Sequence, residues 1–193
     1  VPTTAAVLGA LGQAAQAGIA VDAERVERAL SFLDARVDPG TGRSEYHDGA
    51  ERKGYTPTRA NAAAALAARA AVGIPEETAA LRKQAAVIRD RKPRWKLETK
   101  DVKTREGRVV RAQVGTLYPY LWYMADAALR SRSAGKGWRA SLRRTLVGAQ
   151  HDAGHAAGSW DPRGTYSLSG GRAFVTGLGA LILLSDHRYP GRP

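Results

Sequence analysis

The sequence predicts an all-α fold in which two layers of helices form an α/α barrel or an arc of one. Segments that are apolar on every side alternate along the chain with segments that are apolar on one face only. A helix without a polar face has to be covered all round, whereas a helix with one apolar face leaves its other face in water. The alternation therefore indicates an inner and an outer layer of helices.

The two layers are assigned from the pattern of each segment in turn. In the segment 22–37, apolar residues recur at intervals of three and four with charged residues between them, which is typical of an outer helix. The segment 57–72, by contrast, is almost entirely alanine around Leu66. Inner helices are expected at about 3–17, 57–72, 115–131 and 172–185, and outer helices at about 22–37, 76–90 and 137–151.

Several helix boundaries are marked by residues with known preferences. Gly18 ends the first segment, and Asp22 lies where the N-cap of the second is expected. Thr56-Pro57 offers a capping hydroxyl followed by proline in the first turn of the next helix. Gly73 ends that helix, and Pro75-Glu76-Glu77 begins another with acidic residues at its positive end.

Residues 91–113 interrupt the helical pattern with a strongly basic stretch. Between 91 and 111 there are nine Lys and Arg against three Asp and Glu, which is half of the formal net charge of +12. The runs on either side of Glu106-Gly107 predict a β-hairpin or extended arm. Its candidate contacts with a polyanion or a partner are Arg91, Lys92, Arg94, Trp95, Lys96, Arg108 and Arg111.

Three interpretations of this basic segment remain open. It could grip a nucleic acid, with Trp95 stacking on a base. It could contact a protein partner, or it could be a solvated excursion whose charges keep the chain soluble. No recognised nucleic-acid motif accompanies it, which favours the last two interpretations.

Composition narrows the possible functions. The charge of +12 indicates affinity for something acidic, which could be a nucleic acid, an anionic lipid, an acidic protein or an anionic glycan, unless it reflects only an arginine- and alanine-rich proteome. The absence of cysteine excludes disulfides, thiol nucleophiles and zinc sites that need a thiolate. The fully apolar runs are too short to cross a bilayer.

The 193 residues are expected to form one domain. Because the chain begins at Val1 rather than Met, we expect it to be a processed piece of a longer protein. Its compartment is left open, and an extracytoplasmic location, with a signal or anchor upstream, is one option.

One loop and the helix that follows it carry the most distinctive motif. Gly158-Ser159-Trp160-Asp161-Pro162 is followed by Gly170-Gly171-Arg172 and an apolar stretch that contains Thr176. A fainter copy occurs earlier, where Gly42-Arg43-Ser44-Glu45-Tyr46 precedes the helix expected at 57–72, with Thr58 near its start. The two copies indicate an internal repeat of outer helix, loop and inner helix.

These motifs resemble the prenyltransferase/squalene-oxidase repeat, which squalene cyclases, protein prenyltransferase β-subunits and complement-like thioester domains share. The resemblance covers most of the chain and is best in 114–190, where further matching residues occur in the expected order. It implies a terpenoid cyclase-like α/α toroid from a bacterial branch of the family. Four inner and three outer helices would form a partial ring, because the family has about six pairs. The further matches are Tyr118-Pro119-Tyr120-Leu121-Trp122-Tyr123, Trp138, Gln150 and Arg188-Tyr189-Pro190.

The residues that carry chemistry in this family are missing. Cyclases use an Asp-rich D-x-D-D acid, and every aspartate here is isolated. The zinc site of prenyltransferases and the thioester of complement-like domains both need a cysteine. His151 and His155 are four residues apart, but the glycine between them indicates a loop, and no third ligand is evident. We therefore expect no catalytic residue, no metal and no cofactor.

Six residues are candidates for ligand binding on the concave side or the rim of the ring. The tyrosines could line a pocket for an apolar ligand, or could simply pack one layer against the other. Arg172 could face the interior, or could bond the Gly-rich loop or Asp161. The six candidates are Tyr118, Tyr123, Asp126, Trp160, Asp161 and Arg172.

The sequence favours a non-catalytic interaction domain that binds a protein or peptide through its rim loops, 38–56 and 152–171, or associates with itself. The first alternative is a divergent isoprenoid- or glycan-processing enzyme of the α/α-barrel type, with Asp126, Asp161 or Glu45 as acid. The second is an electrostatic binder of nucleic acid or another polyanion through 91–111, whose affinity would fall steeply with salt.

Overall fold

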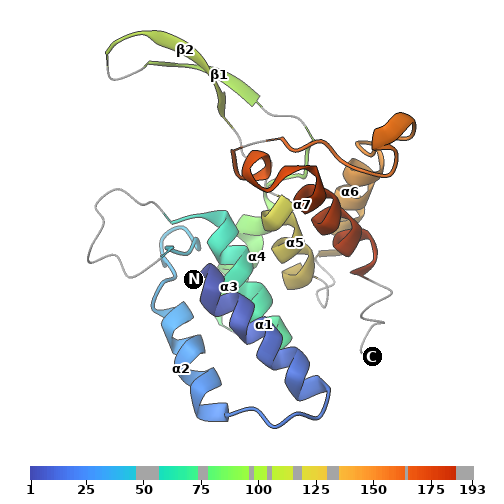
Figure 1. Ribbon diagram of the computed structural model, residues 1–193. Helices are drawn as coiled ribbons and strands as arrows, with labels where there is room; N and C mark the ends of the chain where they lie inside the picture. The colour runs from blue at the N-terminus through green and yellow to red at the C-terminus, as the bar shows by residue number, and fades with distance from the viewer. Residues whose placement is uncertain are drawn as a thin grey trace. The chain divides into compact units, whose positions relative to one another are not determined.

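In the computed structural model the chain is mainly helical (Figure 1). The described residues form seven α-helices, one short 3-10 helix and one antiparallel hairpin of two strands. They divide into a first unit, with Val1–Arg91 and Met124–Arg139, and a second unit, with Lys92–Tyr123 and Ala140–Pro190. The residues that the structure describes are 1–46, 57–73, 78–95, 98–103, 106–114, 119–129, 135–163 and 165–185.

The helices α1 to α4 belong wholly to the first unit. The helix α3 packs against α1 and also against α4. The last residues of α5 and the first of α6 belong to this unit as well. The bounds are α1 Pro2–Gln16, α2 Ala23–Asp34, α3 Arg59–Ala71, α4 Ala79–Arg89, α5 Pro119–Leu129 and α6 Lys136–Val147.

The N-cap residues confirm the predicted start of α2 and correct the predicted start of α3. Asp22 caps α2, because its side chain accepts a hydrogen bond from the backbone N of Arg25 at 3.2 Å. The cap of α3 is Thr58, two residues beyond the predicted Thr56. Thr58 is held extended because its backbone pairs with that of Ser44, so the helix cannot begin earlier.

The helix α4 has Thr78 as its cap, and the predicted start at 75–77 lies outside the described residues. The predicted inner segment 115–131 corresponds to α5, whose helix begins at Pro119. The predicted outer segment 137–151 corresponds to α6, with Leu142 and Leu146 fully or almost fully buried.

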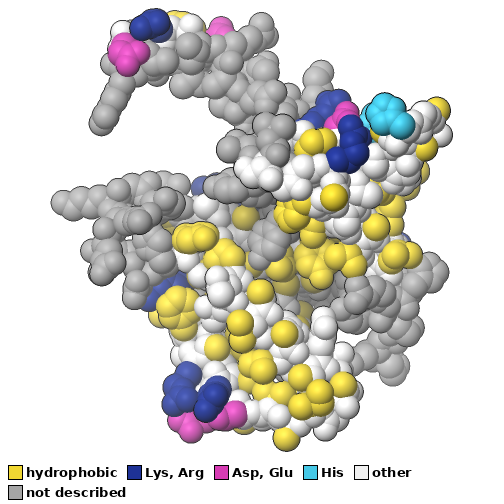
Figure 2. All heavy atoms as spheres, in the orientation of Figure 1, with side chains coloured by type: hydrophobic (Ala, Val, Ile, Leu, Met, Phe, Trp, Pro, Cys, Tyr) yellow, Lys and Arg dark blue, Asp and Glu magenta, His cyan; other side chains and the backbone are white. Residues whose placement is uncertain are grey.

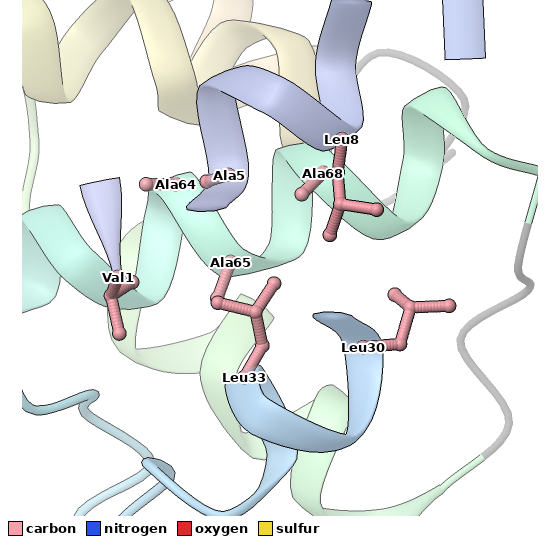
Figure 3. Packing of buried hydrophobic residues seen from close by; sticks show 8 residues of the cluster. All are labelled: Val1, Ala5, Leu8, Leu30, Leu33, Ala64, Ala65 and Ala68. Atoms are coloured by element: carbon pink, nitrogen blue, oxygen red, sulfur yellow. The ribbon is translucent and has the colours of Figure 1, made fainter. Parts of the chain in front are cut away.

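The core of the first unit is built from small residues. Most residues of α3 are buried, and most of these buried residues are alanine. Figure 3 shows leucines of α1 and α2 that fill the space beside it. Small side chains let helices approach closely while keeping the interior dense. The cluster drawn in Figure 3 consists of Val1, Ala5, Leu8, Leu30, Leu33, Ala64, Ala65 and Ala68.

Two of the four helices expected to be covered all round are covered on one side only. In α1, Val7 is 53% exposed, and in α7, Phe174 is 40% exposed. The expectation was wrong for α1 and α7 because most of the apolar residues on their exposed faces are alanine or glycine, such as Ala6, Ala10 and Gly177, which carry little penalty in water, and single larger residues are tolerated there. Most residues of α3, and most of residues 122–129 in α5, are buried, as predicted.

The second unit contains the predicted hairpin and the loop motif. The strands β1 (Glu98–Lys103) and β2 (Val109–Val114) are antiparallel, with Glu98 opposite Val114 and Lys103 opposite Val109. The short helix η2 (Gly154–Ala156) lies in the loop after α6. No described helix is both long and apolar enough to span a membrane.

The last helix, α7 (Thr165–Leu183), is longer than predicted. It is broken at Gly171, whose φ of 67° is left-handed, so the predicted helix from 172 is its second part. Residues 165–170, expected in the rim loop, form the first part instead. A left-handed residue interrupts a helix at little cost only where it is glycine.

The contact between α1 and α3 yields a test of the close packing. A Cβ atom on Gly12 would lie 2.4 Å from the carbonyl oxygen of Ala71, so Gly12→Ala has to push two backbones apart. We expect a loss of about 3 kcal/mol in unfolding free energy. A Cβ atom on Gly9 in the same helix would meet no atom within 4 Å, so Gly9→Ala should add about 0.5–1 kcal/mol through helix propensity.

Denaturant unfolding of both variants, beside the unaltered chain, measures the difference. Equal effects of the two alanines would contradict the packing of α1 on α3.

Candidate functional site

Trp160 anchors the Gly-rich loop 150–163 to the helices on either side of it in sequence. Its indole N–H donates to the carbonyl oxygen of Leu146 in α6 at 2.8 Å, and its backbone N donates to Thr176 Oγ1 in α7 at 3.3 Å. Gly179 leaves room for the ring, since a Cβ there would lie 3.1 Å from it. Trp160 is 2% exposed, so its ring supports the loop from within the fold.

The loop is also closed by bonds between its own ends. Gln150 Nε2 donates to the carbonyl oxygen of Gly158 at 2.8 Å. The backbones of His151 and Ser159 are bonded at 2.9 Å, and those of Gly158 and His151 at 2.7 Å. Gly158 has a φ of 78°, which a residue with a side chain would adopt only with strain. The loop is therefore held in one conformation by its backbone.

Asp161, beside the buried tryptophan, is the centre of a group of polar side chains that we call the Asp161 cluster. Its Oδ1 accepts a hydrogen bond from Arg172 Nη2 at 2.8 Å and lies 2.9 Å from His151 Nε2. Its Oδ2 lies 3.7 Å from Arg163 Nη2. Figure 2 shows basic, acidic and histidine side chains together near this end of the second unit. The members of the cluster are His151, Ser159, Asp161, Arg163 and Arg172.

Ser159 connects the cluster to the backbone of the loop. Its Oγ accepts from Arg172 Nη1 at 3.1 Å and donates to the carbonyl oxygen of Ala156 at 2.5 Å. The hydroxyl proton is thus committed to a carbonyl, and His151 is bonded to Asp161 instead. This arrangement orients side chains but does not pair a nucleophile with a base.

The cluster lies at the surface and carries an excess of positive charge. The side chains of Arg163 and Arg172 are 48% and 43% exposed, while the one carboxylate between them is 33% exposed. The hydrogen bond from His151, followed by that from Arg172, holds the pKa of Asp161 below its ordinary value. The cluster therefore holds two guanidinium groups against one carboxylate, and hydrogen bonds to Asp161 and Ser159 fix the position of Arg172.

The other ligand-binding candidates have different surroundings. Asp126, in the first unit, is 1% exposed and accepts a hydrogen bond from Arg139 Nε at 2.8 Å. A buried carboxylate bonded to a guanidinium is typical of a structural ion pair. Tyr123 is half-buried, and Tyr118 lies outside the described residues. Among the six candidates, a hydrogen bond joins Asp161 to Arg172 in the described residues. Trp160 lies between Ser159 and Asp161 in the chain.

The basic segment is anchored close to its start. The carbonyl oxygen of Pro93 accepts from Thr145 Oγ1 at 3.3 Å. The Trp95 ring packs on that of Trp122, with centroids 5.7 Å apart and an angle of 48° between the planes. In the first unit, Arg91 O accepts from Trp138 Nε1 at 2.9 Å. These anchors were not predicted, because they join residues more than 25 positions apart.

The predicted polyanion contacts are mostly solvent-exposed where the structure describes them. Arg91, Lys92, Arg94 and Arg108 are exposed, and Trp95 is half-buried. Arg111 lies in β2 opposite Asp101, and Lys96 lies outside the described residues.

No group of three His, Cys, Asp or Glu side chains suited to a metal ion occurs among the described residues. Comparison with protein-family models, curated proteins and solved structures gives no match to this chain. The interpretation of function therefore depends on the residues and contacts of the chain itself.

The depressed pKa of Asp161 predicts an acid-sensitive contribution to stability. A carboxylate with a lowered pKa in the folded state stabilises the fold above its ordinary pKa, and this contribution is lost as the pH falls through the folded value. Asp161→Asn should therefore lower the melting temperature most near neutral pH, and the difference from the unaltered chain should shrink below about pH 4.

Asp152→Asn is the matched control, because Asp152 is exposed in the same loop and bonds to no other described residue. Thermal unfolding across the acid range measures both variants. If the two asparagine variants behave alike, the bonds to Asp161 do not stabilise the loop.

Proposed function

We propose that the chain is a non-catalytic helical interaction domain, an arc of an α/α toroid, which binds an acidic protein or peptide through its rim loop 150–163. The observation that carries this proposal is the Asp161 cluster. Arg163 and Arg172 are exposed, yet contacts with Asp161 and Ser159 orient their guanidinium groups. Asp161 and Ser159 belong to the rim loop, in which hydrogen bonds join the two ends to each other and to α7. Cations fixed in advance lose less conformational entropy when a carboxylate partner binds them.

A repeated pattern in the two units supports the toroid. In the first unit, the backbone of Ser44 in the loop after α2 pairs with Thr58, the cap of α3. In the second unit, the backbone N of Trp160 in the loop after α6 bonds to Thr176 in α7. In each unit an outer-type helix therefore leads into a loop that is bonded to a threonine of the following helix. Such a recurrence is expected of a repeat architecture.

Charge supports an acidic partner over a neutral one. The formal net charge is +12, and several acidic side chains are already bonded within the fold. Asp34 pairs with Arg69 between α2 and α3, and Asp126 pairs with Arg139. The field that remains at the surface is positive, and such a field accelerates and orients the approach of an acidic partner.

A second candidate function is polyanion binding through the basic segment 91–111. The exposure of Lys92, Arg94 and Arg108 favours it. Against base stacking, the ring of Trp95 already packs on Trp122. The enzyme alternative is weaker, because Asp126 is buried in an ion pair and Asp161 accepts bonds from two side chains.

Charge reversal at the rim loop tests the proposal. Arg163→Glu should weaken binding of a poly-glutamate peptide about tenfold, because one attraction is replaced by a repulsion. Arg28→Glu, on α2, is the control, since Arg28 is 66% exposed and the same change in net charge occurs away from the loop. Fluorescence anisotropy of the labelled peptide measures both.

Binding that Arg163→Glu leaves unchanged would exclude the rim loop as the contact. Tighter binding of single-stranded DNA than of the peptide, with a steep dependence on salt, would favour the second candidate.

A further inference from the structure

A cavity of about 510 Å³ lies in the first unit, at the end where α1 finishes and α2 begins. Pockets that hold small organic molecules have volumes in this range. The last two turns of α1, the first two turns of α2 and the end of α3 form its walls. In Figure 1, this is the end of the unit at which a loop joins α1 to α2. The described residues of the lining all belong to the first unit, whereas the rim loop belongs to the second.

Most of the larger side chains of the lining are aliphatic. Leu30 is part of the buried core cluster of the first unit, and Val26 and Val72 pack against that cluster. A hydrocarbon chain in the cavity would thus lie against the core and lose its contact with water, which is favourable. The large aliphatic residues of the lining are Leu11, Val21, Val26, Leu30 and Val72.

Among the described residues of the lining, one is charged, and it is acidic. Glu27 in α2 is exposed and forms no ion pair or hydrogen bond with another described residue. The basic residues near it in α2 are already paired, Arg25 with Asp22 at 3.0 Å and Arg28 with Glu24 at 2.9 Å. A carboxylate is therefore available at the cavity to bind a cation, although the chain as a whole is strongly basic.

The helix ends at the cavity also favour a cation. The last carbonyl groups of a helix lack partners within it, and they lie at the negative end of its dipole. Two helices, α1 and α3, end at the cavity. The last turn of α1 contains no basic residue, and Arg69 in the last turn of α3 is bonded to Asp34. The third helix, α2, begins there with its positive end, but Asp22 caps it and Glu24 follows in its first turn.

We infer that the cavity binds an aliphatic amine, with its carbon chain among the aliphatic side chains and its ammonium group at Glu27. Gln16 offers a second acceptor, because its Nε2 donates to the carbonyl oxygen of Ala71 at 3.4 Å and its amide oxygen is left to accept. An ammonium group has three donors and can bond to both side chains. The inference goes beyond the proposed function, because it assigns a separate site to a small ligand of the opposite charge.

Three compounds with the same eight-carbon chain test the inference. Octylamine, 1-octanol and octanoate differ in the charge of their head groups, so a difference in affinity comes from the head group. We expect octylamine to bind about tenfold more tightly than octanol, because its ammonium group forms charge-assisted hydrogen bonds, and octanoate to bind most weakly. An NMR titration of the isotope-labelled full chain at neutral pH measures the three affinities. The amide signals that shift should come from the ends of α1 and α3 and the start of α2.

Two variants separate the carboxylate from the cavity itself. Glu27→Gln should weaken binding of octylamine about fivefold and leave that of octanol unchanged, because the side chain keeps its size and loses its charge. Asp152→Asn is the control, since Asp152 is exposed in the second unit and bonds to no other described residue. Ala15→Phe should weaken both ligands about tenfold, because Ala15 is exposed in the lining and the larger ring would fill the cavity.

Equal binding of octylamine and octanol, or tightest binding of octanoate, would overturn selection of an ammonium group by the cavity. Shifts confined to other parts of the chain, binding that Ala15→Phe leaves unchanged, or no binding of any of the three compounds would overturn the cavity as a ligand site. None of these outcomes bears on the rim loop, because its test uses an acidic peptide and Arg163→Glu.

Discussion

Close approach between helices at glycine and alanine is the constraint on which both units depend. In the first unit, Gly12 of α1 meets the backbone of Ala71 in α3, and in the second, Gly179 of α7 lies against the ring of Trp160. A Cβ atom on Gly12 would overlap the backbone of Ala71, and one on Gly179 would press on the Trp160 ring at 3.1 Å. The interior of the first unit is dense mainly because alanine-rich helices come close together, whereas in the second unit a glycine makes room for a large buried ring. A dense interior of this kind is sensitive to added volume.

The same constraint determines what reaches the surface. Once Trp160 is buried between α6 and α7, its neighbours Ser159 and Asp161 come to lie beside the start of the second part of α7. The break at Gly171 lets Arg172 begin that part, where it bonds both neighbours. A buried aromatic side chain thus positions an exposed polar cluster, which is how a rigid scaffold gives a loop a defined surface.

The distribution of charge links this surface to the proposed function. Within the described residues, Asp34 and Asp126 are both bonded to arginines. Asp126 is buried, whereas Asp34 is 64% exposed and pairs with the buried Arg69. Arginines such as Arg94 and Arg108 are exposed instead. Acidic side chains such as Glu24 and Asp90 are exposed as well, so the positive charge of the surface comes from the excess of 30 Lys and Arg over 18 Asp and Glu.

Features that arise from local interactions could be predicted from the residues alone. The spacing of apolar residues identified the helices, Asp22 marked the cap of α2, and Glu106-Gly107 indicated the hairpin. Which side of α1 and α7 is covered depends on contacts with other segments, because an alanine-rich helix has the same pattern whether it is enclosed or half in water. The bond between Arg172 and Asp161 is one of the alternatives that the sequence left open for Arg172. The pairing of Ser44 with Thr58 and the bond of His151 to Asp161 were not expected, because helical periodicity does not encode contacts between separate segments.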